Sequence, residues 1–188
     1  MESDVIRRAR QHDETAWETL VAQHQEAVFR LAYLLLGSAA DADDVAQEAF
    51  VRAFRFLDGF DTERPLRPWL LRITANLARN RRRSVGRYMA HLRRLVWAEP
   101  ERVIDPEGQT ARNADSQALW EAVRRLDTND QEVIYLRYFM ELSVEETADV
   151  LKIASGTVKS RLHRALNRLR AVVEQDFPIL QRESALND

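Results

Sequence analysis

Apolar residues recur every three or four positions along most of this chain, and little interrupts that pattern. The 188 residues include only five glycines and five prolines, and runs of β-branched residues are absent from the sequence. A repeat of this length places apolar side chains on one face of an α-helix. With 45% apolar and 31% charged residues, the composition is that of a globular protein with one domain or two small ones. The sequence therefore predicts an all-α fold.

The predicted helices form two groups with a break between them. Pro100, Pro106 and Gly108 lie in a stretch with few large apolar residues, which indicates a flexible linker over residues 98–113. The linker separates a first small helical domain, residues 10–97, from a second, residues 114–175. The expected helices span residues 14–36, 40–57 and 66–94 in the first domain and 114–126, 130–140, 144–151 and 156–174 in the second.

Local signals mark some of the helix ends in the first domain. Asp13 directly precedes the helix expected at residues 14–36 and is a candidate N-cap. Gly59, Pro65 and Pro68 indicate a loop between the second and third helices.

Composition excludes several classes of protein. The chain has no cysteine, which rules out disulfides, thiol catalysis and cysteine-ligated metals. The four histidines are too scattered to suggest a metal site, and five glycines permit neither a GxGxxG nor a GxxxxGK[ST] nucleotide-binding loop. A paired-carboxylate active site would need a histidine base, a pocket or metal ligands, and the sequence indicates none of these. We therefore expect no catalytic residue, no metal and no cofactor.

The sequence also bears on location. Its most apolar stretch, residues 31–40, is far shorter than the roughly 20 residues that cross a membrane. The N-terminal residues contain no apolar signal core. These features predict a cytoplasmic protein without membrane insertion.

Charges are unevenly distributed along the chain. Residues 1–63 carry 6 basic and 13 acidic side chains, residues 64–94 carry 10 arginines and no acid, and residues 95–188 carry 12 basic and 17 acidic side chains. A second acid-free window, residues 152–170, holds six basic residues. A single charge run is usually a solvated face, but two such windows in an otherwise acidic chain favour nucleic-acid binding.

The second basic window belongs to a segment with helix-turn-helix proportions. Ser143 and Glu146 form a capping box at the start of a short helix, a break follows at residues 152–155, and a longer helix then begins. Polar and basic side chains share one arc in its N-terminal turns, where a recognition helix meets the major groove. A solvated surface helix has the same periodicity, but the three features together favour DNA reading. The predicted contacts are Ser155, Thr157, Lys159, Ser160, Arg161, Arg164 and Arg168.

Two helices of the first domain have distinct polar patterns. Asp44, Gln47, Glu48 and Val51 form a strip beside the buried face of the helix at residues 40–57, and this strip offers carboxylates to a basic partner. The early aspartates also suit the positive end of the helix dipole, and the two roles are compatible. On the third helix, arginine and asparagine recur on one face, which suits contacts with a DNA strand. These residues are Arg72, Asn76, Arg79, Asn80 and Arg83.

Several motifs resemble one known family. GTVKSRLHRALNRLR, residues 156–170, with LDTNDQEVIYLRYFMELSVEETA upstream, closely resembles region 4 of bacterial extracytoplasmic-function sigma factors. DADDVAQEAFVRAF, residues 41–54, resembles the region 2 helix of these proteins that docks on RNA polymerase. RPLRPWLLRITANLARNRRRS, residues 64–84, resembles the part that opens and reads the promoter −10 element. Lys152 departs from the family, which usually has glycine at this position. If the backbone φ there is positive, lysine destabilises the fold by about 1 kcal/mol relative to glycine.

The resemblance implies a two-domain RNA polymerase sigma factor that is not an enzyme. It implies bacterial core RNA polymerase, promoter DNA and a cognate anti-sigma factor as partners. The second domain would read the −35 element as duplex through the recognition-helix residues given above. The implied polymerase-binding residues are Asp43, Asp44, Gln47, Glu48 and Val51. The implied −10 contacts are Phe60, at the base of a loop that could hold an unstacked base, and Arg72, Asn76, Arg79, Asn80 and Arg83.

One alternative from another class remains open at this point. A conventional helix-turn-helix regulator would have a helical sensor or dimerisation domain in place of the polymerase-binding domain. It would form dimers on half-sites about 34 Å apart. The acidic motif at residues 41–54 and the arginine-rich third helix count against it, because a sensor domain requires neither.

Overall fold

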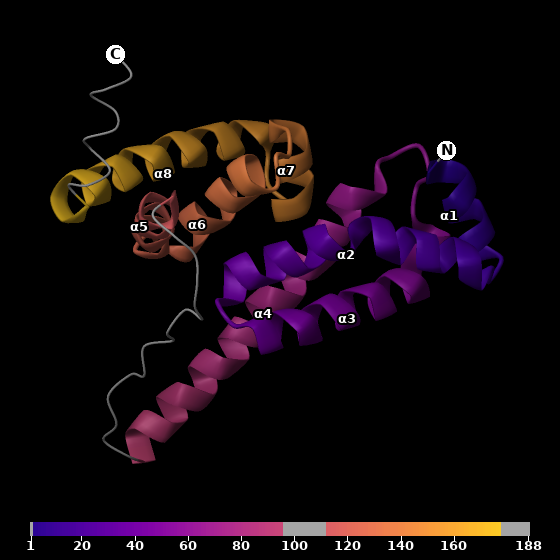
Figure 1. Ribbon diagram of the computed structural model, residues 1–188, viewed down its shortest axis with the longest axis horizontal. Coiled ribbons are helices and arrows are strands. Elements are labelled where there is room, and N and C mark those ends of the chain that lie inside the picture. Colours follow the sequence, from indigo (N-terminus) through magenta and orange to yellow (C-terminus); the bar gives the residue numbers. More distant parts are fainter. Residues whose placement is uncertain (1, 96–111, 178–188) are drawn as a thin grey trace. The chain divides into compact units, whose positions relative to one another are not determined.

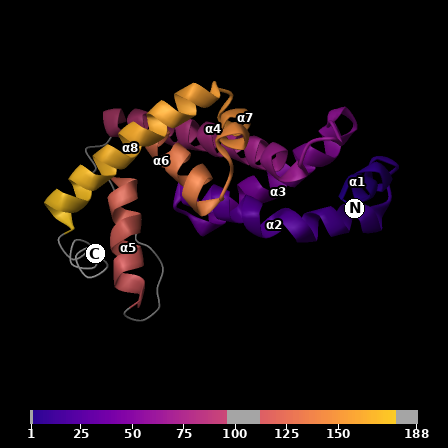
Figure 2. The same cartoon turned by 90° about the horizontal axis from the view of Figure 1, so that it is seen from above.

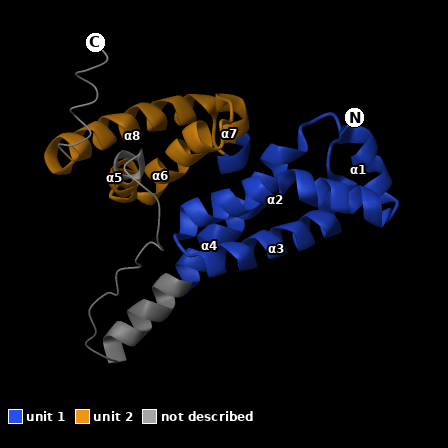
Figure 3. Ribbon diagram, viewed as in Figure 1, with its two compact units in different colours: residues 1–103, 149–152 blue, residues 104–148, 153–188 orange. Residues whose placement is uncertain are grey.

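The protein, described by a computed structural model, is built from helices (Figures 1 and 2). The structure describes residues 2–95 and 112–177, with side chains for residues 2–84 and 117–177. These residues contain no strand, and the predicted all-α fold is confirmed. Two compact units are present: residues 1–103 with 149–152, and residues 104–148 with 153–188 (Figure 3). The predicted linker lies almost wholly outside the described residues.

Three long helices and one short helix make up the first unit. α2 (Glu14–Leu36), α3 (Ala39–Phe56) and α4 (Leu66–Leu95) pack against one another, and α1 (Glu2–Arg10) packs against α2 (Figure 1). A 3-10 turn, η1 (Leu57–Gly59), follows α3. Burial of each leucine contributes about 1.5–3 kcal/mol, so packing is the main source of helix stability here. The buried core includes Leu20, Val28, Leu31, Ala42, Ala49, Leu66 and Leu71.

Capping residues determine where α2 begins and how α3 follows it. Asp13 is the N-cap of α2, as predicted, and accepts a hydrogen bond from the N–H of Ala16 at 3.1 Å. That bond, with Arg8 beside it, lowers the pKa of the Asp13 carboxyl. Gly37 ends α2 with a φ of 70°, a left-handed conformation without steric cost for glycine. Ser38 then caps α3, so two residues reverse the chain.

Two features of the first unit differ from the predictions. The sequence analysis missed α1, a helix of nine residues that buries only Ile6 and Ala9 fully. So short an apolar stripe gives little periodic signal, and the helix depends on packing for its stability. Pro68, which we used as a loop signal although the expected helix began at residue 66, lies in the first turn of α4. Its missing N–H costs no helical hydrogen bond there, and its φ suits a helix start.

The second unit contains three α-helices and most of a fourth among its described residues, because residues 149–151 are grouped with the first unit. They are α5 (Arg112–Arg124), α6 (Thr128–Ile134), α7 (Val144–Leu151) and α8 (Ser155–Asp176). α5 and α6 both pack against α8, and α5 is seen nearly end-on in Figure 1 and along its length in Figure 2. The helix predicted at residues 144–151 matches α7, and the others differ from their predictions by one or two residues at most ends.

The helix predicted at residues 130–140 is divided in the structure. After α6 the backbone widens into a π-helical turn, η2 (Tyr135–Phe139), in which the N–H of Met140 donates to the carbonyl of Tyr135 at 2.8 Å. The turn places the rings of Tyr135 and Phe139 5.6 Å apart, and Trp120 of α5 stacks on Tyr135 at 5.5 Å. Side-chain periodicity could not reveal this change, because a single wide turn leaves the apolar pattern nearly intact.

The helix-turn-helix has the local features that the sequence predicted. The N–H of Ser143 donates to the Glu146 carboxylate at 2.7 Å, and the N–H of Glu146 donates to the Ser143 hydroxyl at 3.0 Å, which confirms the capping box. Lys152, directly after α7, has a φ of 57°. The conformation that glycine would favour is therefore present at the position where this chain has lysine.

Candidate functional site

The acidic strip predicted on α3 lies on one outer side of that helix. Asp43 accepts a hydrogen bond from the Gln47 amide at 2.8 Å, and Glu48 pairs with Arg52 at 2.7 Å. The side chain of Asp44 is 63% exposed, and Val51 is 44% exposed. The structure thus brings the five predicted polymerase-binding residues together on a face that is open in this unit.

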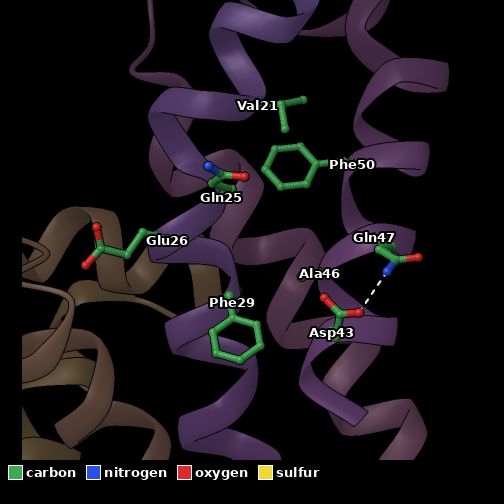
Figure 4. Close-up of a pocket in the computed structure, with 8 residues that line it drawn as sticks. All are labelled: Val21, Gln25, Glu26, Phe29, Asp43, Ala46, Gln47 and Phe50. Atoms are coloured by element: carbon green, nitrogen blue, oxygen red, sulfur yellow. Dashed lines mark hydrogen bonds between the residues drawn. The ribbon is translucent and has the colours of Figure 1, made fainter. Parts of the chain in front are cut away.

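A groove between α2 and α3 adjoins this strip (Figure 4). Its volume is about 460 Å³, and Asp43 and Gln47 form part of its α3 side. The α2 side was not predicted, because the sequence could not show which face of α2 lies beside α3. The groove is lined by Val21, Gln25, Glu26, Phe29, Asp43, Ala46, Gln47 and Phe50. Apolar side chains flanked by carboxylates suit an amphipathic helix with basic residues.

The predicted DNA-binding residues of α4 recur along one side of the helix. Asn76, Asn80 and Arg83 are exposed, and Arg72 and Arg79 are partly exposed. The Arg79 guanidinium donates to the Asn76 side-chain carbonyl at 2.8 Å. The side chains therefore form a continuous polar row, although the part of α4 beyond residue 84 is described only as backbone.

Arg81 connects this basic helix to the acidic helix α3. Its guanidinium lies 2.6 Å from the Asp41 carboxylate and 3.2 Å from that of Asp44. The hydrogen bond and charge of Asp41, with a smaller effect of Asp44, raise the pKa of Arg81. The sequence analysis did not predict a role for Arg81. Its partners lie 37 and 40 positions away, so no local pattern indicates the contact.

Phe60 has a different environment from the other predicted −10 residues. Its side chain is only 6% exposed, and its ring lies 5.0 Å from the ring of Trp69 in α4. In this structure Phe60 forms the buried base of the loop, and the exposed part of that loop begins with Asp61. A direct contact of Phe60 with a base would require this packing to open.

The recognition helix α8 presents most of its predicted contact residues near its N-terminus. Lys159, Ser160 and Arg164 are exposed, while Ser155, Thr157 and Arg161 are partly exposed. Val158 and Ala165 face the core and are fully buried. Basic and hydroxyl side chains therefore occupy the outward arc of the first three turns, in the position expected for base and phosphate contacts.

Arg168, farther along α8, is engaged within the second unit. Its guanidinium bonds to Asp130 at 2.5 Å and to Asp127 at 2.9 Å. Asp130, with Asp127, raises the pKa of Arg168. The Asp130 side chain is only 5% exposed, and Asp127 is the N-cap of α6. Arg168 thus holds α8 against the start of α6, a role that the sequence analysis missed.

The described residues contain no cluster of three or more histidine, aspartate or glutamate side chains arranged to hold a metal. Within the same residues, no helix is long and apolar enough to cross a bilayer.

Comparison with known proteins matches both units to one family. Residues 20–88 match the sigma-70 region 2 model, and residues 116–169 match the sigma-70 region 4 model. The sigma factor SigW of Bacillus subtilis is 33% identical over 174 residues, which cover 88% of this chain and 92% of SigW. This chain is an extracytoplasmic-function sigma factor of the sigma-70 family. As a sigma factor it is not an enzyme, and family membership excludes the regulator alternative.

Other sigma factors resemble the chain over similar lengths. SigL of Mycobacterium tuberculosis is 34% identical over 162 residues, which cover 83% of this sigma factor and 88% of SigL. The solved structure of CnrH in complex with the cytosolic domain of CnrY is 28% identical, with a TM-score of 0.70, and covers 93% of this chain and 98% of CnrH. RpoE from Bartonella quintana, solved with the anti-sigma factor NepR, has a TM-score of 0.68 at 26% identity over 85% of this chain and 97% of RpoE.

Proposed function

We propose that this sigma factor divides promoter recognition between its two units. The first domain, residues 10–97, binds core RNA polymerase through the α3 strip and captures the −10 element with α4 and the preceding loop. The second, residues 114–175, reads the −35 element as duplex with α8. Residues 98–113 connect the two. The protein acts in the cytoplasm, where core polymerase and the promoter are found.

One observation carries this proposal: the acidic α3 strip and the arginine-rich row of α4 belong to the same small helical unit. The strip is negatively charged and bordered by an apolar groove, which suits a basic helical surface of a protein. The α4 row is basic and rich in side-chain amides, which suits single-stranded DNA. A unit with both surfaces can use polymerase binding energy to offset the few kcal/mol needed to unpair each captured base.

We also propose an anti-sigma factor as a partner. CnrH and RpoE were solved in complexes with CnrY and NepR, and both structures cover most of this chain. The α2–α3 groove, with its exposed Phe29 and the carboxylates of Glu26 and Asp43, offers a binding site for a segment of such a protein.

The test is transcription in vitro with bacterial core RNA polymerase and genomic DNA fragments. We expect discrete RNA starts that depend on the purified chain, and the aligned upstream DNA should contain two elements. Arg164→Ala and Asn80→Ala are then each tested on promoters that are altered in one element at a time. The element to which each variant becomes insensitive is assigned to the unit that carries the substitution. If Arg164→Ala left −35 preference unchanged, or Asn80→Ala reduced polymerase binding as much as promoter opening, the assignment would be wrong.

A further inference from the structure

Arg10, the last residue of α1, contacts the chain segment that follows α3. Its Nε donates to the carbonyl of Leu57 at 3.0 Å, and its Nη2 donates to the carbonyl of Phe60. These partners are 47 and 50 positions away in the sequence. The planar guanidinium has several donors in one rigid fork, so a single side chain fixes two backbone groups at once.

The two carbonyls lie at both ends of the short turn that leads from α3 to the loop. Leu57 begins η1 and is 2% exposed, and its carbonyl also accepts the N–H of Phe60 at 3.0 Å. Phe60 has an extended backbone, with φ −78° and ψ 135°, and its ring packs on Trp69. Arg10 therefore holds the last buried residue before residues 61–65, which are exposed except for the partly exposed Thr62.

Helix α1 is itself attached to the bundle on two sides. Ile6 and Ala9 are buried, and the Nε2 of His24 in α2 lies 3.0 Å from the carboxylate of Glu2. Arg10 thus extends from an anchored helix, and its position is determined by packing. α1 lies outside the region 2 match, which begins at residue 20.

We propose that Arg10 is a positioning residue for −10 recognition: by bonding to the carbonyls of Leu57 and Phe60, it fixes the conformation of the loop at residues 61–65. This inference rests on the proposed function, in which that loop receives an unstacked base. To distinguish between bases, the loop must hold its hydrogen-bond donors and acceptors in fixed positions. A loop that moves loses base selectivity before it loses nonspecific contacts with DNA. Arg10 contacts no DNA itself and acts through the loop backbone.

The experiment measures base preference with the full chain bound to core polymerase. Transcription is compared on promoters that carry each of the four bases at every −10 position. Arg10→Ala removes both bonds, and Arg10→Lys retains a charge that reaches one carbonyl. Arg7→Ala is the matched control, because Arg7 lies on the same helix, is exposed and pairs only locally with Asp4 among the described contacts. Circular dichroism and core-binding assays establish that each variant is folded and assembled.

We expect Arg10→Ala to reduce the preference at one or more −10 positions at least about fivefold, the smaller end of the usual cost of a mismatch. Arg10→Lys should show a partial loss and Arg7→Ala none, with −35 preference unchanged in all three. An equal fall in transcription on every promoter would overturn the inference, because it would show a purely structural role.

A second variant separates this inference from the proposed function. Thr62→Ala combined with Glu63→Ala alters the exposed loop and leaves Arg10 and its carbonyl partners in place. If this variant loses −10 preference and Arg10→Ala retains it, the loop reads the base and only the role of Arg10 is wrong. If neither variant changes the preference, the loop does not read the −10 element, and both proposals fail.

Discussion

Lys152 occupies a backbone conformation that favours glycine. With a φ of 57°, its Cβ is close to the following carbonyl oxygen, a cost of about 1–2 kcal/mol that glycine avoids. Glycine in turn lowers the free energy of unfolding by about 0.5–1 kcal/mol, because it gives the unfolded chain greater conformational freedom. We therefore expect Lys152→Gly to raise the free energy of unfolding by up to about 1 kcal/mol, measured by urea denaturation. Lys152→Ala is the control: it removes the long side chain, keeps the Cβ and should give no such gain.

Asp41 and Asp44 of α3 both pair with Arg81 of α4, and Asp44 is the more exposed of the two. We expect Asp44→Arg to reduce affinity for core RNA polymerase at least tenfold, about 1.4 kcal/mol, since it reverses a charge in the proposed docking strip. Affinity is measured by fluorescence anisotropy with labelled chain and core enzyme. Asp4→Arg makes the same charge change on α1 and should bind normally. Normal binding by Asp44→Arg would show that the docking face lies elsewhere.

At the scale of elements, the contact between α6 and α8 depends on a few polar side chains. Asp127 caps α6 with its own carboxylate and also accepts from Arg168, so the same residue starts one helix and orients another. Asp130 is nearly buried, and a buried carboxylate is costly without a partner. These ion pairs therefore help to set the rotation of α8, and with it the direction in which its outward arc faces.

This arrangement predicts coupling between Arg168 and Asp130. Arg168→Ala should lower the melting temperature, because it leaves the Asp130 carboxylate without its partner, and Arg168→Ala with Asp130→Asn should recover part of that loss. Arg164→Ala, on the exposed arc, is the control and should melt normally. A variant Arg168→Ala that melted like the wild type but bound −35 DNA more weakly would show that Arg168 acts by contacting DNA.

At the scale of the whole molecule, acidic segments accompany the two basic windows, residues 64–94 and 152–170. The net charge is −2, although residues 64–94 alone carry 10 arginines and no acid. The acidic residues repel the phosphate backbone and weaken nonspecific binding, whereas the local basic fields remain available at a promoter. In the proposed function, selective binding then requires a partner that brings the chain to the promoter, and core polymerase has that role.

We therefore expect weak promoter binding by the free chain and tight, specific binding by its complex with core enzyme. Anisotropy of a labelled promoter duplex at physiological salt, with and without core enzyme, measures the difference. A duplex of scrambled sequence is the control, and the free chain should distinguish the two poorly. Tight sequence-specific binding by the chain alone would contradict the proposal that polymerase binding supplies part of the free energy of promoter recognition.

The sequence by itself determined the features that depend on neighbouring residues. Helical periodicity predicted an all-α protein, and Asp13 and the Ser143–Glu146 pair predicted caps that the structure confirms. Each of these features depends on side chains and backbone within about four residues, so its cause is visible in a short stretch of sequence.

The tertiary structure decided the features that join distant residues. Arg10 bonds to Phe60, Arg81 pairs with Asp41, and Arg168 pairs with Asp130, at separations of 38 to 50 positions. The sequence shows that these arginines are present, but it gives them no partner. A partner depends on which helix faces pack together, because only packing brings the groups within hydrogen-bonding distance. The groove between α2 and α3 exists for the same reason.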